Sequence, residues 1–316
     1  MLKQAATQAL AAPIIWNRLR ARAAPAGSVT ILCYHTLGDV EGWTARGISD
    51  FQADLALLSD RFEIVPLETG LERLGDTSAP PSVVLTFDDG DRGLARDLLP
   101  SLEDARATAT IYVATGQIET GQPFWFDRVV NALQQPCSID VEGLGHWRLG
   151  EETGKARWAL IGDILAAIKT MPEDAREAAA DTVVRQAGAT TDTHPLGPMR
   201  VEDLQRLAEH PAITIGAHSH GHELLDGIAP EAARESVRRS LTLLREWTGQ
   251  SVVHFAYPNG NYSPDLATML QDEGCASATI LEERPALPSD DRFMLPRVSV
   301  GRYDTPDRMI VRMAGI

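Results

Sequence analysis

Short β-branched runs alternate with longer helical patterns along most of the 316 residues, and this alternation constrains the fold more than any other feature. It predicts an α/β fold in which crossover helices join the strands of a parallel sheet. The clearest helices are predicted from Ser49, as the cap, to about Arg61, and from Pro230 to Trp247, just before Gly249. The predicted strands are Val29–Cys33, Phe62–Val65, Ser82–Phe87, Thr108–Val113, Ile213–Ala217, Ser251–Tyr257, Ala276–Ile280 and Leu295–Val300.

The alternation is lost between about residues 116 and 198. The parts predicted there are an aromatic segment at 124–126, a strand pair near 138–149, helices near 154–170 and 172–187, and a returning loop over 190–198. We therefore expect a (β/α) barrel domain over residues 27–316, with this helical insertion over one end of the barrel. A basic helical segment is expected over residues 1–26.

Acidic side chains outnumber basic ones by 44 to 29, and the net charge of −15 disfavours nucleic acid as a partner. The first 26 residues reverse this balance, with four basic side chains and no acidic one: Lys3, Arg18, Arg20 and Arg22. Packing of this segment on the body as an amphipathic helix is the favoured interpretation, and weak attachment to an acidic surface is the alternative. No apolar run is long enough for a transmembrane segment. The cations follow the apolar run, unlike those of a secretory signal, so we expect a cytoplasmic protein.

Two carboxylates follow the predicted strand Ser82–Phe87. Asp88 and Asp89 stand directly before Gly90, at the carboxyl end of an apolar run. In parallel α/β folds, catalytic groups gather at this end of the strands. The structural alternative is an Asp-Asp-Gly turn that caps the next helix.

Three histidines within five residues follow the predicted strand Ile213–Ala217. His218 and His222 are four residues apart, so a helical turn would bring them to one side, where they could bind a single ion, while His220 points away. With Asp89 they form the set of two imidazoles and one carboxylate found in catalytic zinc sites. The pattern predicts a metal-dependent hydrolase that uses a divalent ion, zinc. Four histidines have no partner at a strand end, and the three cysteines are scattered, so no function is predicted for any of them: His146, His194, His210, His254, Cys33, Cys137 and Cys275.

Together, the motifs Thr86-Phe87-Asp88-Asp89-Gly90 and His218-Ser219-x-x-His222 resemble those of the polysaccharide deacetylases, the NodB-homology group of carbohydrate esterases. The resemblance implies a distorted parallel (β/α) barrel of that family's type and an N-acetylated glycan as substrate. It also implies that Asp88 is the general base and that Asp89, His218 and His222 bind the metal. The chemistry agrees, because a metal-bound carboxylate is a poor base and its free neighbour is a better one.

The third motif departs from the commonest family pattern, because position 256 is alanine where an arginine usually stands. Arg297 is a candidate to orient Asp88 in its place, and a surface arginine is the alternative. Tyr257-Pro258 resembles the family's substrate groove, where a backbone N–H after the aromatic residue would help to hold an oxyanion. We therefore group Tyr257 and Arg297 as residues on the substrate side of the site.

The usual C-terminal acid histidine is also missing, because no histidine follows His254. The run Ile31–His35 is an apolar strand that ends in Tyr34-His35, and it resembles the exopolysaccharide-type members, in which this pair supplies the acid. We therefore predict that His35 is the general acid, and a structural histidine at a strand end is the alternative.

Three other functions are weighed against this one. Relatives on the same fold hydrolyse other C–N bonds, in cyclic amides or ureides, and a non-catalytic carbohydrate-binding relative is conceivable. A phosphoryl-transfer enzyme is disfavoured, because no phosphate-binding glycine motif occurs and the histidines would be unexplained. Trp125 and Trp147 could stack on sugar rings, but a role in the core is the favoured interpretation for both.

Overall fold

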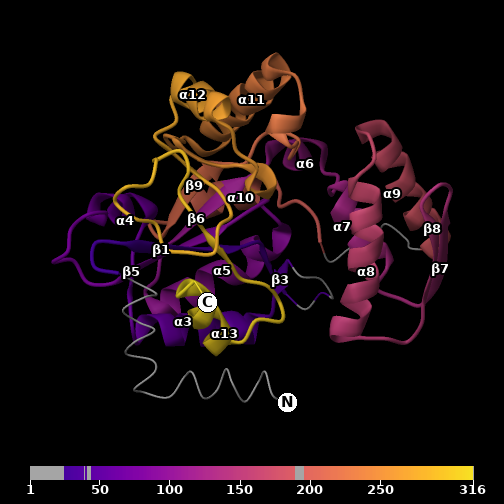
Figure 1. Cartoon of the computed structure of the whole chain (residues 1–316), viewed down its shortest axis with the longest axis horizontal. Helices are drawn as coiled ribbons and strands as arrows, with labels where there is room; N and C mark the ends of the chain where they lie inside the picture. Colours follow the sequence, from indigo (N-terminus) through magenta and orange to yellow (C-terminus); the bar gives the residue numbers. More distant parts are fainter. Residues whose placement is uncertain (1–24, 39, 41–43, 189–195, 316) are drawn as a thin grey trace.

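The computed structural model describes residues 25–38, 40, 44–188 and 196–315. Its main sheet is parallel and curls into a half-barrel with the strand order β11-β10-β9-β6-β5-β1-β12, and β4 pairs with β5 (Figure 1). The predicted (β/α) barrel is confirmed. Each predicted strand is present, several of them shorter than expected: β1 Val29–Tyr34, β4 Glu63–Ile64, β5 Ser82–Phe87, β6 Ala109–Val113, β9 Ile213–Ala217, β10 His254–Ala256, β11 Ser277–Thr279 and β12 Val298–Ser299.

The pairing register brings several strand ends to one edge of the sheet. β1 and β5 pair over their full lengths, ending with Tyr34 opposite Phe87, and β6 and β9 end with Val113 opposite Ala217. The residues that follow β1, β5 and β9 therefore emerge at the same carboxyl edge. The curl is completed by the segment before β12, in which Leu295 bridges to β11.

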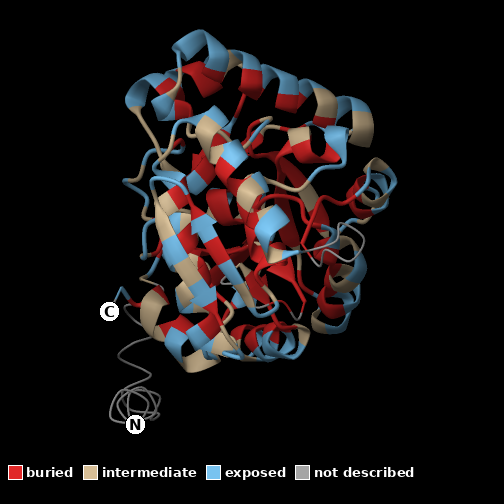
Figure 2. Ribbon diagram, turned by 90° about the vertical axis from the view of Figure 1, so that its right-hand side faces the viewer, coloured by how far each residue is buried: buried red, intermediate tan, exposed pale blue. Residues whose placement is uncertain are grey.

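Helices cover the outer face of the sheet, and their outward surfaces are exposed while the strands are buried (Figure 2). These helices are α3 Ile48–Ser59, α4 Leu67–Arg73, α5 Arg92–Ala105, α6 Thr115–Thr120, α10 Val201–Ala208, α11 Pro230–Thr248, α12 Pro264–Asp272 and α13 Pro306–Met313. The capping prediction for Ser49 is wrong, because α3 begins at Ile48 and its N-cap is Gly47, whose backbone leads into the helix without a side-chain cap. None of the helices in the described part of the chain is long and apolar enough to cross a membrane.

The segment between α6 and α10 forms a small unit beside the carboxyl edge of the sheet, next to α6 and β3 (Figure 1). It comprises α7 Trp125–Ala132, the antiparallel pair β7 Cys137–Val141 and β8 Gly145–Leu149, α8 Gly154–Lys169 and α9 Glu173–Ala187. Its apolar side chains form a core of their own, which Val40 and Ala45, near β2 Thr36–Leu37 and β3 Ala45–Arg46, join. Trp125 and Trp147 pack against this core, which favours a structural role for both.

Two predicted segments fall on residues that the structure does not describe. Most of the basic helical segment predicted over 1–26 lies outside the described residues, as does most of the returning loop predicted over 190–198. The end of that loop is described, and it lies against the loop after β5: the Arg92 N–H donates to the Gly197 carbonyl, and the Met199 N–H donates to the Gly90 carbonyl.

Candidate active site

Three side chains from two loops converge at the carboxyl edge of the sheet. Asp89 follows β5, whereas His218 and His222 follow β9. The Nε2 atoms of His218 and His222 lie 3.5 Å and 3.3 Å from Asp89 Oδ1. One potential ligand atom from each residue lies within 4.8 Å of the other two. The three residues that the sequence singles out as metal ligands are therefore close enough to hold one ion.

The chemistry of these donor atoms fits a divalent cation. Asp89 Oδ1 is buried and has no hydrogen-bond partner in the described part of the chain. His218 Nδ1 lies 2.7 Å from the Ala256 carbonyl oxygen, and because a carbonyl can only accept, Nδ1 carries the hydrogen and the Nε2 lone pair faces Asp89. Burial lowers the pKa of His218 to about 4, so this imidazole is neutral near pH 7. An unsatisfied carboxylate oxygen beside a neutral, oriented imidazole is what a zinc ligand set requires.

His222 behaves differently from His218. Burial disfavours its charged form, but the Asp89 carboxylate beside it prevails and raises the pKa of His222 above its ordinary value. Burial would likewise raise the pKa of Asp89, and the adjacent His222 outweighs burial and lowers it. The two pKa shifts favour a charged His222 beside an ionised Asp89 in the protein without an ion, and a metal ion would replace the proton on His222.

The loops that carry these ligands are held in backbone conformations that favour glycine. Asp89 has a φ of 74° and His222 a φ of 58°, in the left-handed region that costs free energy for other residues. The first turn of α6 stabilises both loops: Gln117 Nε2 donates to the Asp89 carbonyl at 2.8 Å, and the Gly116 N–H donates to the His220 carbonyl at 2.6 Å. A Cβ at position 116 would lie 2.7 Å from that carbonyl oxygen, so this contact requires glycine.

Asp88 lies beside the cluster and is held by Arg297. The Nη1 and Nη2 atoms of Arg297 donate to the two oxygens of Asp88 at 2.6 Å and 2.7 Å, and the guanidinium lies 5.4 Å from the ring centroid of Tyr112. Burial would raise the pKa of Asp88, but the charge of Arg297 prevails and lowers it. Arg297 is fully buried, so the alternative of a surface arginine is wrong. Asp88 Oδ2 is still 3.9 Å from His218 Nε2, next to the candidate ligands.

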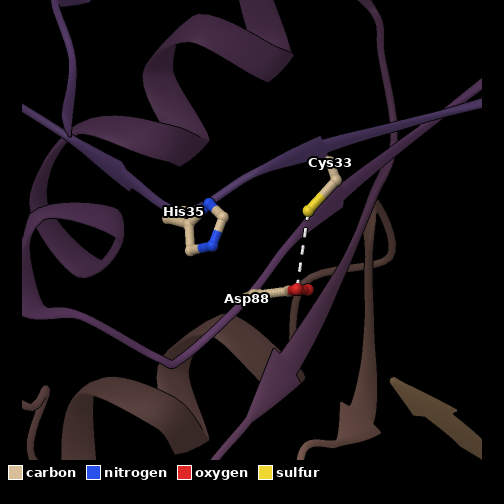
Figure 3. Close-up of side chains that lie close together, drawn as sticks. All are labelled: Cys33, His35 and Asp88. Atoms are coloured by element: carbon tan, nitrogen blue, oxygen red, sulfur yellow. Dashed lines mark hydrogen bonds between the residues drawn. The ribbon is translucent and has the colours of Figure 1, made fainter. Parts of the chain in front are cut away.

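A second group of donor atoms lies on the other side of Asp88. His35 follows β1, and one potential ligand atom each from Cys33, His35 and Asp88 lies within 4.8 Å of the others (Figure 3). The Cys33 thiol donates to Asp88 Oδ2 at 3.4 Å. Because Arg297 already neutralises Asp88 and burial raises the pKa of Cys33 well above its ordinary value, this group is poorly suited to a cation. It instead places an imidazole next to the carboxylate.

The prediction for Tyr257 is wrong in two respects. Its backbone N–H donates to the Thr279 carbonyl at 3.1 Å, and the next residue, Pro258, has no N–H, so this position offers no donor to an oxyanion. Its side chain is fully buried, and the ring packs against Phe255 and Tyr262 rather than lining a groove. The N–H after the aromatic residue, which the sequence interpretation assigned to an oxyanion, is therefore absent.

Some residues of the site could not be identified from the sequence pattern. The Cys33 thiol at Asp88 and the Tyr112 ring at Arg297 both come from the interior of strands, where an apolar run predicts only core packing. The Ala256 carbonyl that orients His218 is a backbone group, and only the pairing of neighbouring strands brings it there.

The fold and the site together define a parallel α/β half-barrel protein that carries a candidate single-ion site and a carboxylate–imidazole pair at its strand ends. The family model for polysaccharide deacetylase matches residues 75–278. The chain belongs to this family.

Several solved structures have the same fold. The deacetylase PplD from Streptococcus pyogenes, solved in complex with acetate, is 15% identical over 90% of this chain and 98% of its own, with a TM-score of 0.62. IcaB from Ammonifex degensii is 16% identical over 91% and 97% of the two chains, with a TM-score of 0.58. The BpsB deacetylase domain from Bordetella bronchiseptica is 15% identical over 88% and 97%, with a TM-score of 0.53. A search of curated proteins finds no match.

Proposed function

We propose that the protein hydrolyses N-acetyl groups on the amino sugars of an acetylated polysaccharide or oligosaccharide. The observation that carries this proposal is the juxtaposition of two groups: the cluster of Asp89, His218 and His222, and the neighbouring carboxylate of Asp88, which Arg297 holds apart from it. Binding to a metal would make Asp89 a poor base, whereas Asp88 keeps lone pairs that can accept a proton. Membership of the polysaccharide deacetylase family supports the acetylated glycan as substrate.

Asp89, His218 and His222 are the residues that would hold a divalent ion, and zinc suits their two imidazoles and one carboxylate. When bound there, the ion would act as a Lewis acid toward the acyl oxygen and toward a coordinated water. The protein's own contribution includes the hydrogen bond from His218 Nδ1 to the Ala256 carbonyl, which orients this imidazole with its Nε2 lone pair toward the ion.

Asp88 acts as the general base in this proposal. It accepts a proton from the attacking water while the water oxygen forms a bond to the acyl carbon. The bidentate contact with Arg297 fixes the orientation of the carboxylate and favours its ionised form, which a base requires.

His35 acts as the general acid. As the C–N bond breaks, its imidazolium gives a proton to the amide nitrogen, so water and the N-acetyl sugar yield acetate and a free amino sugar. A donor atom of His35 lies within 4.8 Å of one on Asp88, which allows both side chains to reach one acyl group from neighbouring strands. No covalent intermediate with the protein is needed.

Acetate release and metal content of the purified protein test this proposal. The native protein, loaded with zinc, should release acetate from N-acetylglucosamine oligosaccharides. Asp89→Ala should lose the metal, whereas Asp88→Asn should retain it and lose about 10²–10⁴-fold in kcat. Asp60→Asn is the matched control, because this carboxylate is 76% exposed and remote from the cluster in sequence and contacts.

Two outcomes would overturn the proposal. Turnover of a cyclic amide or ureide without acetate release would identify a different C–N hydrolase. Full acetate release by Asp88→Asn would show that the base is another group.

A further inference from the structure

The first turn of α7 brings three side chains from the insertion to the candidate metal centre. Phe124, the N-cap of α7, and Phe126 stack on each other with ring centroids 5.1 Å apart. Both rings also contact the imidazole of His222, at centroid distances of 5.1 Å and 5.4 Å. Both side chains are half-buried, so each keeps a surface that solvent or a ligand can reach.

Asp127 follows this pair and faces the loop after β5. It shares one helix face with Asn131, four residues later, and Asn131 Nδ2 donates to the Leu196 carbonyl at 2.8 Å. The next residue in that segment, Gly197, donates its N–H to Asp91 Oδ2 at 2.7 Å. Asp127 therefore points toward the loop that contains Asp89 and Asp91. Burial, and then the negative charges of these two carboxylates, raise the pKa of Asp127 well above its ordinary value.

The Asp127 side chain lacks a partner although it is buried. The residue is 8% exposed, no hydrogen bond or ion pair joins it to a residue that the structure describes, and its oxygens are not among the fully enclosed atoms without a partner, so a ligand can reach them. A buried polar group without a partner costs free energy. The carboxylate is therefore free to accept a hydrogen bond from a donor outside the chain.

The aromatic residues of this turn divide between two roles. Trp125 packs against the insertion's own core, and Arg176 lies over its ring at 5.7 Å. Phe124 and Phe126 turn the other way, toward His222. Aromatic side chains with a small number of polar groups are typical of the lining of small-molecule sites.

We propose that the first turn of α7 is the sugar-binding wall of this site: Phe124 and Phe126 pack against the apolar face of a pyranose ring, and Asp127 forms a hydrogen bond with one of its hydroxyl groups. This inference rests on the proposed function, because it names the part of the acetylated glycan that the insertion binds. It also predicts selectivity, since a cyclic amide or ureide offers no pyranose face to the aromatic pair.

Binding and turnover of N-acetylglucosamine tetrasaccharides, in β-1,4 and β-1,6 linkage, test the wall. The variants are Phe124→Leu, Phe126→Leu, their double variant and Asp127→Leu, with Trp147→Leu as the aromatic control from the insertion's core. The small ester 4-nitrophenyl acetate serves as a substrate without a sugar, and metal content reports on His222.

The double leucine variant should raise KM for the preferred tetrasaccharide about 10-fold, as expected for the loss of two ring contacts. Its kcat/KM for the small ester should fall less than its kcat/KM for the tetrasaccharide, and its metal content should match that of the parent. Asp127→Leu should also raise this KM, and its melting temperature should equal or exceed that of the parent, because the change removes a buried carboxylate without a partner. Equal losses on both substrates, or a lower melting temperature with an unchanged KM, would overturn the proposal.

Calorimetric binding separates this inference from the proposed function. If the parent releases no acetate but Asp88→Asn binds a tetrasaccharide and the α7 changes weaken that binding, the wall stands and the proposed reaction fails. If the parent releases acetate and the α7 variants match it in KM, the wall fails and the reaction stands. If Asp88→Asn binds neither tetrasaccharide, the wall is overturned.

Discussion

Replacing Arg297 with methionine tests how the protein maintains a charged base in its interior. The side chain of Arg297 is fully buried, and the side chain of Asp88 is 4% exposed. Methionine fills much of the same space, so the main change is the loss of two charge-assisted hydrogen bonds. Breaking a buried ion pair by removing one partner costs about 3–5 kcal/mol, because the remaining charge is uncompensated. This is a large part of the roughly 5–15 kcal/mol that stabilises a typical domain.

The direction in which stability changes with pH follows from the two causes that shift the pKa of Asp88. In the parent, the charge of Arg297 outweighs burial, and the pKa of Asp88 lies below its ordinary value of 3.8. Without Arg297, burial prevails and this pKa rises above 3.8. A carboxyl group with a raised pKa in the folded state stabilises the fold below its ordinary pKa, and that stability is lost as the pH rises through the raised value. The destabilisation of Arg297→Met should therefore be small in acid and complete in mild alkali.

Denaturant unfolding at about pH 5 and about pH 8 measures this difference. The double variant Asp88→Asn/Arg297→Met is the control, because a neutral amide replaces the unpaired charge and should recover much of the lost stability. The acid limb of kcat/KM for acetate release should also move to higher pH in Arg297→Met. A destabilisation that is equal at both pH values, or below about 1 kcal/mol at the higher one, would refute the reasoning.

Three further outcomes are expected. His35→Ala should keep its metal and lose about 10²–10⁴-fold in kcat on an N-acetyl sugar, but much less on 4-nitrophenyl acetate, whose leaving group needs no proton; equal losses would contradict its role as acid. Zinc uptake by the metal-free protein at about pH 6 should release a proton, because Asp89 raises the pKa of His222 and the ion displaces the proton from this imidazole; calorimetry in buffers of different ionisation enthalpy measures this release, and its absence would exclude a protonated His222. Gly216→Ala should lower the free energy of unfolding by about 1–3 kcal/mol, since its Cβ would lie 2.4 Å from the Tyr112 ring. An unchanged denaturant midpoint would show that the Tyr112 ring moves aside without cost.

The strands and the ligand motifs were predictable because their signals are local. Apolar runs that end in polar clusters predict strands with functional ends, and β5 and β9 match the predicted bounds. His218 and His222 do come together, but the predicted helical turn is wrong, because the chain after β9 is an irregular loop in which Ser219 and His222 have left-handed φ values of 63° and 58°. The capping prediction for Ser49 was wrong because α3 begins at Ile48, with Gly47 as its N-cap. The capping preference of one residue does not by itself decide where a helix begins.

The acid–base pair and the surroundings of the base depend on contacts between distant segments. Many arginines could in principle face Asp88, and Arg297 does so because the segment from Leu295 to Arg297 bridges β11 before β12 joins β1. Tyr257 was misassigned for the same kind of reason, because only the packed structure shows that its ring is buried against Phe255 and Tyr262.

The sequence by itself determined the parallel α/β class and the two motifs that supply Asp89, His218 and His222, because short-range periodicity and spacing encode both. Only the tertiary structure decided that Arg297 holds Asp88, that Cys33 contacts it, and that α7 brings Phe124 and Phe126 to the candidate metal centre. These contacts arise from the curl of the sheet and from the docking of the insertion, which depend on the packing of the whole chain.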